Sequence, residues 1–151
     1  MTQANAYKIG DVLPDGWVVG PISPDTGIVM AIEPESSALQ GYKTWYQGKK
    51  HADALQGQGH VNARLPAPKE LNALFNDVVK AGHNQHAQFN TKLSFFGKSS
   101  TLYWASSAPV LLLRSLFARV QYFGKGGVAD VLKLDTANVR CVRDEAGLTL
   151  T

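Results

Sequence analysis

From Thr101 to the C-terminus, short apolar runs alternate with glycines and polar residues, and no run is long enough for an extended helix. We predict four strands in this part of the chain: residues 102–106, 115–123, 128–133 and 138–143. The sequence has 14 glycines and 7 prolines in 151 residues, which favours many turns and short elements over a helical bundle.

A hairpin is predicted before the first helix. Residues 17–19 and 28–32 are apolar, and residues 23–27 between them read Ser-Pro-Asp-Thr-Gly. Proline presets its own φ, aspartate can bond to nearby backbone, and glycine accepts a positive φ. This segment therefore predicts a turn between two strands.

Two helices are predicted between the hairpin and the C-terminal strands. Thr44 and Gln47 have the spacing of a capping box, and residues 56–59 should end that helix. Pro68 suits the first turn of the second helix, and Gly82 suits its end. Each helix carries an apolar stripe at helical spacing, made of Trp45, Gly48, Ala52 and Leu55 in the first and Leu71, Leu74, Phe75, Val78 and Val79 in the second.

The expected fold class is α+β, with two helices packed on twisted antiparallel sheets and with long loops. The length suits a single domain over residues 1–151. We expect the two ends of the chain to meet in adjacent strands.

Composition limits the partners and the location. Residues 1–40 carry one basic and five acidic side chains, whereas residues 83–143 carry eight basic and two acidic ones. No run of lysine or arginine is present, so we expect an ordinary solvated face, and nucleic acid is not an expected partner.

The longest apolar run, residues 108–113, is far shorter than the ~20 residues of a membrane span. The N-terminus lacks the apolar core of a signal peptide, which favours a virion or a bacterial host cytoplasm.

Several motifs, in this order and spacing, resemble a known family over residues 7–144. The motifs are Tyr7-Lys8-Ile9-Gly10-Asp11, Arg64-Leu65-Pro66 with Lys69-Glu70-Leu71-Asn72-Ala73-Leu74-Phe75, Tyr103-Trp104-Ala105-Ser106-Ser107, and Val139-Arg140-Cys141-Val142-Arg143. The chain resembles the C-terminal domains of bacterial collagen-like adhesins, which also occur in phage proteins. The resemblance implies a C-type-lectin-like fold, shared in outline with formylglycine-generating enzymes, and a role in attachment to glycans or surfaces.

The sequence departs from the family pattern at three places. Ala63 stands where the family usually has tryptophan, and Ala67 where it usually has a capping threonine, a loss of ~1 kcal/mol. An apolar segment replaces the polar loop that usually follows Ser107. Its residues, predicted to form a partner interface or a homo-oligomer contact, are Pro109, Val110, Leu111, Leu112 and Leu113. A buried strand over residues 110–113 is the alternative.

No catalytic residue, metal site or cofactor is predicted. Cys141 is the only cysteine, so neither a copper-binding cysteine pair nor an internal disulfide can form, and we expect it to be a small buried residue on a strand. His83 and His86 have i, i+3 spacing but no evident third ligand, and His51 and His60 are expected in surface or packing roles. Residues 83–127 contain no aspartate or glutamate, which disfavours a calcium-dependent sugar site.

The predicted ligand contacts lie in the C-terminal strands. Alternation along residues 117–123 places Arg119 and Gln121 on one face, which we expect to be exposed. Ser106 and Ser107 should join them, together with Lys125 in the glycine-rich turn 124–127, while Trp104 is expected in the core.

The expected function is a non-enzymatic binding module, an attachment or decoration protein of a phage particle or surface. Its partner would be a glycan or a protein. A small intracellular regulator that binds a host protein is one alternative, and a degenerate enzyme of the formylglycine-generating type is another.

Overall fold

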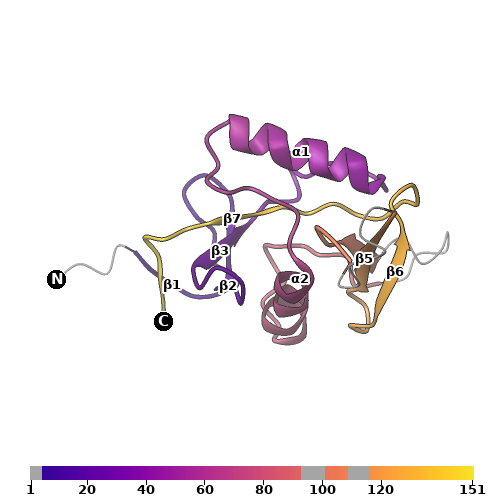
Figure 1. Ribbon diagram of the computed structural model, residues 1–151. Helices are drawn as coiled ribbons and strands as arrows, with labels where there is room; N and C mark the ends of the chain where they lie inside the picture. Colours follow the sequence, from indigo (N-terminus) through magenta and orange to yellow (C-terminus); the bar gives the residue numbers. More distant parts are fainter. Residues whose placement is uncertain (1–4, 93–100, 109–115) are drawn as a thin grey trace.

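The described residues form two three-stranded antiparallel sheets, which occupy different parts of the molecule (Figure 1). The computed structural model describes residues 5–92, 101–108 and 116–151. In the first sheet, β3 (Val29–Ile32) lies between β2 (Val18–Ile22) and β7 (Val142–Asp144). In the second, β5 (Phe117–Tyr122) lies between β4 (Leu102–Trp104) and β6 (Val128–Leu132). The described part of the chain is thus a mixed α+β structure with few helices, as predicted.

The segment before β7 links the two sheets. Asn138 forms a parallel bridge with Tyr103 of β4, and its carbonyl accepts from the Trp104 amide. Four residues later the same segment enters β7 and pairs with β3. Only the end of the predicted strand 138–143 is therefore a regular strand. The predictions over 102–106, 115–123 and 128–133 each contain one observed strand.

The predicted hairpin and the pairing of the chain ends are confirmed. β2 and β3 flank the turn, where Gly27 has a φ of 72° and Ser23 Oγ accepts from the amides of Asp25 and Thr26. β1 (Ala6–Tyr7) pairs in parallel with β8 (Thr149–Leu150), close to both termini (Figure 1).

α1 (Trp45–Gly57) begins and ends where the sequence predicts. Thr44 and Gln47 form the complete capping box, and the C-cap is Gln58. Gly48, Ala52 and Leu55 are the buried residues of this helix. Capping and the apolar stripe were sufficient to locate it, because both signals are local.

α2 (Pro68–Leu74) continues as a π-helix, η1 (Phe75–Lys80). Ala67 makes no side-chain cap, as predicted, but Glu70 Oε1 accepts from the Ala67 amide at 2.9 Å. After η1 the chain turns away at Gly82, whose φ is 84°. The sequence did not predict the change to π-helix.

The sheets are packed on both faces. One cluster joins Ala52 and Leu55 of α1 to side chains of both sheets, including Val19 and Trp104. The other joins α2 and η1 to the opposite faces, where Met30 and Phe123 lie. The helices therefore lie on opposite sides of the sheets, and the buried position predicted for Trp104 is confirmed.

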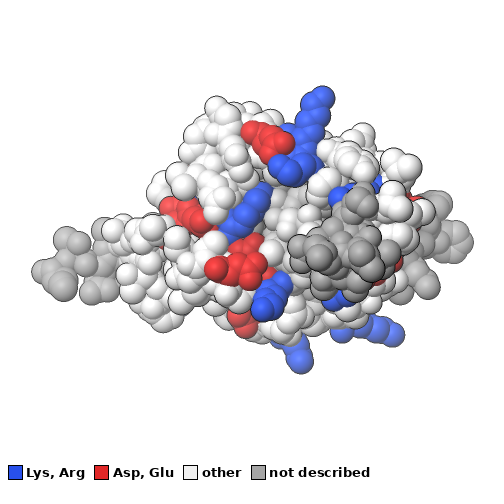
Figure 2. All heavy atoms as spheres, in the orientation of Figure 1, with Lys and Arg blue, Asp and Glu red and all other residues white. Residues whose placement is uncertain are grey.

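The charged side chains are mixed on the surface. Figure 2 shows acidic and basic side chains next to one another across the middle of one face, and the described residues form no continuous basic patch there. Within the part of the chain that the structure describes, no helix combines the length and the apolar character needed to cross a membrane.

Candidate functional site

An open groove lies beside α2, with a volume of about 950 Å³. Two of the predicted ligand residues, Ser107 and Arg119, line it. The other lining residues are Pro24, Asp25, Ala67, Pro68, Lys69, Asn72, Ala73, Asn76, Asp77 and Val128. The groove therefore brings the end of the Tyr-Trp-Ala-Ser-Ser motif and strand β5 against the polar side of the second helix.

Arg119 is held in place by the neighbouring strand. It lies opposite Asp130 in the β5–β6 register, and its Nε and Nη2 donate to the two Asp130 carboxylate oxygens at 3.0 and 3.4 Å. The two side chains are 26% and 21% exposed. This contact fixes the plane of the guanidinium, and no described residue is a hydrogen-bond partner of Nη1.

The prediction that Gln121 is an exposed ligand residue is wrong. Gln121 is 1% exposed, because α2 covers this face of β5. Its Nε2 donates to Asn72 Oδ1 at 2.9 Å and to the Gly126 carbonyl at 3.1 Å. Gln121 thus supports the groove by positioning Asn72, which does line it.

The remaining predicted contacts are not brought into the groove. Ser106 is half-buried and its amide donates to the Pro66 carbonyl, while Lys125 is exposed in the β5–β6 turn. Neither residue lines the groove. The predicted interface of residues 109–113 lies outside the described residues.

The contribution of α2 and η1 to the groove was not predicted from the sequence. Lys69, Asn72, Asn76 and Asp77 occupy the side of the second helix opposite its apolar stripe. Their helical spacing was visible in the sequence, but the pattern could not show that β5 and Ser107 face this polar side.

A buried ion-pair network holds the start of α2 against the sheets. Arg64 donates to both Glu70 carboxylate oxygens, from Nη2 at 2.6 Å and from Nε at 3.2 Å. Arg64 also pairs with Asp144 of β7, and Ser23 donates to Glu70 Oε2 from the β2–β3 turn. The network fixes the helix that forms one wall of the groove.

Burial and hydrogen bonding act on Glu70 in opposite directions. Burial raises its pKa, but the hydrogen bonds from Arg64, Ser23 and the Ala67 amide, together with the charge of Arg64, outweigh burial. The pKa of Glu70 therefore lies below its ordinary value, and the side chain is ionised at neutral pH.

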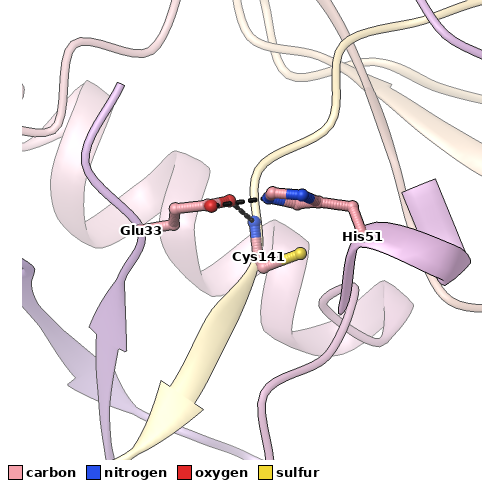
Figure 3. Close-up of side chains that lie close together, drawn as sticks. All are labelled: Glu33, His51 and Cys141. Carbon is pink, nitrogen blue, oxygen red and sulfur yellow. Dashed lines mark hydrogen bonds and ion pairs between the residues drawn. The ribbon is translucent and has the colours of Figure 1, made fainter. Parts of the chain in front are cut away.

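Figure 3 shows a second group of side chains, none of which lines the groove. Glu33 follows β3, His51 is in α1, and Cys141 precedes β7. His51 Nε2 lies 2.7 Å from Glu33 Oε2, and one ligand atom from each of the three side chains lies within 4.8 Å of the others. Among the described residues this is the one group of three or more potential metal ligands, and His83 and His86 are not part of it.

The group lacks the features of an activated cysteine nucleophile. Burial, followed by the nearby Glu33 charge, raises the pKa of the Cys141 thiol well above its ordinary value. A buried thiol of raised pKa is poorly reactive. The hydrogen bond to Glu33 raises the pKa of His51, so its imidazole is more readily protonated. The three side chains together provide one sulfur, one nitrogen and one oxygen atom as potential metal ligands.

This group was not predicted from the sequence. The predicted burial of Cys141 is confirmed, but the residue lies just before β7 and not on a strand, and His51 was expected only in a surface or packing role. The three residues lie far apart in the sequence, so no motif spacing could have joined them. No protein-family model matches the chain, and no curated protein matches its sequence.

Proposed function

We propose that this protein is a non-enzymatic binding module of C-type-lectin-like fold that recognises a glycan through the groove beside α2. The resemblance of the motifs to those of the adhesin-domain family supports the fold, and the α+β architecture is compatible with it. The observation that carries the binding site is that Ser107 and Arg119, from the predicted ligand lobe, line one groove with the polar side of the second helix.

The lining favours a glycan over a protein. Seven of the 12 described side chains that line it are polar or charged. Amide, carboxylate, hydroxyl and guanidinium groups together offer the donors and acceptors that neighbouring sugar hydroxyls need. Protein interfaces instead depend on desolvated hot-spot side chains packed in an apolar core, whereas the described lining of this open groove is mostly polar.

The proposed setting is the attachment or decoration of a surface, in a phage particle or on a bacterial cell. A binding module in this role needs a rigid groove more than a reactive centre. The Arg119–Asp130 contact and the Gln121–Asn72 hydrogen bond each fix a lining side chain before a ligand arrives. Such preorganisation reduces the entropy lost on binding.

A glycan array followed by calorimetry on the best ligand tests this proposal. We expect Arg119→Ala to weaken binding ~10-fold or more, and Ser107→Ala to weaken it several-fold, because each removes a hydrogen-bonding group. Lys125→Ala is the matched control, since this basic side chain is exposed on the same hairpin but does not line the groove.

Two results would contradict the proposal. One is an array on which no glycan binds the folded protein. The other is a loss of affinity in Lys125→Ala as large as that in Arg119→Ala, which would place the ligand at the turn and not in the groove.

A further inference from the structure

We propose that Glu33, His51 and Cys141 form a binding site for one divalent metal ion of the zinc class. The three side chains come from three separate segments, yet their ligand atoms lie within 4.8 Å of one another (Figure 3). This site is independent of the proposed glycan groove, because none of the three residues lines that groove.

The donor set determines the class of metal. Thiolate, imidazole and carboxylate are the ligands that Zn²⁺ takes in proteins, whereas Ca²⁺ and Mg²⁺ take oxygen ligands. Zinc sites that bind an exogenous ligand have three protein ligands and leave the fourth position open to water. The geometry therefore suits Zn²⁺, and Co²⁺ or Cd²⁺ as substitutes.

Burial and charge are compatible with an ion at this point. Glu33 and Cys141 are fully buried, and the His51 side chain is 19% exposed, so the group has one side toward solvent. An ionised carboxylate and a thiolate together balance the two charges of the metal. The loaded site would be neutral, which avoids the large cost of burying a net charge.

Backbone and hydroxyl groups already orient the carboxylate. Ser37 Oγ donates to Glu33 Oε2 at 2.9 Å, and the Cys141 amide donates to Glu33 Oε1 at 3.2 Å. Hydrogen bonds of this kind hold metal ligands in place and raise affinity. They also tie the position of Glu33 to the backbone that carries the thiol.

The metal ion would bind between His51 and Glu33, in place of the hydrogen bond that now joins them. Zinc bonds to nitrogen and oxygen are ~2.0–2.2 Å and to sulfur ~2.3 Å, so small side-chain rotations must bring the three ligand atoms to one centre. The ion displaces the proton on His51 Nε2 and the thiol proton of Cys141. If the His51 imidazole is protonated at the start, the protons of His51 Nε2 and of the Cys141 thiol both pass to solvent, and His51 Nδ1 keeps its proton.

Titration of the metal-free protein with Co²⁺ is the most direct test. We expect one equivalent to bind with a thiolate-to-cobalt charge-transfer absorption, and Zn²⁺ to displace it. Cys141→Ser should abolish the charge-transfer band. His51→Gln should weaken Co²⁺ binding at least ~10-fold, because loss of a ligand should cost no less than loss of an outer-shell partner.

The controls separate this site from surface histidines and from the groove. A His83→Ala, His86→Ala double variant and Arg119→Ala should both bind Co²⁺ as the unchanged protein does. Because changes at the fully buried Glu33 and Cys141 could unfold the chain, the partly exposed His51→Gln serves as the second variant, with circular dichroism as the check on folding. A rise in melting temperature with Zn²⁺ that is lost in His51→Gln is the expected independent readout.

The proposal is overturned if the folded protein gives no charge-transfer band with Co²⁺. It is also overturned if the band survives in Cys141→Ser, or if folded His51→Gln keeps full affinity. In each of those cases the three residues are a hydrogen-bonded cluster without a metal.

Discussion

Glu70 shows how one buried side chain can join several segments of this fold. It is 1% exposed and contacts Arg64 before α2, Ser23 in the β2–β3 turn and the backbone at the start of its own helix. Arg64 extends the connection to Asp144 in β7. A buried charge is tolerated here because every contact supplies a hydrogen bond to it.

We expect Glu70→Gln to lower the free energy of unfolding by about 3–5 kcal/mol, since it removes one partner of a buried ion pair. Chemical denaturation monitored by tryptophan fluorescence measures the change. The matched control is Asp53→Asn, the same carboxylate-to-amide change in an exposed pair with Lys49, with an expected loss below about 0.5 kcal/mol. Equal effects at the two positions would show that the buried network adds no stability of its own.

At the scale of elements, α1 has two glycines whose surroundings differ. A Cβ on Gly48 would lie 2.9 Å from Val139 Cγ2 and 3.4 Å from Leu65 Cδ2, whereas a Cβ on Gly57 would meet nothing within 4 Å. The helix approaches the core closely at Gly48 because that residue has no side chain. At Gly57 the absence of a side chain serves no packing purpose.

We therefore expect Gly48→Ala and Gly57→Ala to act in opposite directions. The first should destabilise the protein by about 1–2 kcal/mol through overpacking, despite the better helix propensity of alanine. The second should stabilise it by up to about 1 kcal/mol through that propensity. Thermal and denaturant unfolding of the two variants test this, and stabilisation by both would mean that α1 does not pack closely against Val139.

Element boundaries were predictable to different extents. The capping box of α1 and the Ser-Pro-Asp-Thr-Gly turn are local signals that need no tertiary contact, and both were confirmed. The exposure of the two faces of β5 was not predictable, because alternation shows which residues share a face but not which element covers that face. Arg119 and Gln121 share one face, and only Arg119 reaches the groove, because α2 covers the strand at Gln121.

At the scale of the whole molecule, acid should destabilise the fold through its paired carboxylates. Burial raises the pKa of Asp15, but hydrogen bonds from Arg143 and the Trp17 amide outweigh it, so the pKa of Asp15, like that of Glu70, is lowered. A carboxyl whose pKa is lower in the folded state contributes stability above its unfolded pKa. That contribution is lost as the pH falls through the folded value.

We expect the free energy of unfolding to fall as the pH decreases below the ordinary carboxyl pKa of about 4. The difference between the unchanged protein and Glu70→Gln should be largest near neutral pH and should narrow in acid, because the amide does not titrate. Denaturant unfolding over a series of pH values measures both effects. Parallel curves for the two proteins would contradict a lowered pKa at Glu70.

The sequence by itself determined the α+β class, the hairpin, the two helices and the burial of Trp104 and Cys141. The elements depend on turn chemistry, capping and periodicity, which act over a few residues, and the burial of the two side chains follows from their residue types. The tertiary structure alone decided that Gln121 is buried, that α2 forms a wall of the groove, and that Glu33, His51 and Cys141 meet. Those outcomes depend on which elements pack against one another, and residues distant in the sequence carry no local signal of that packing.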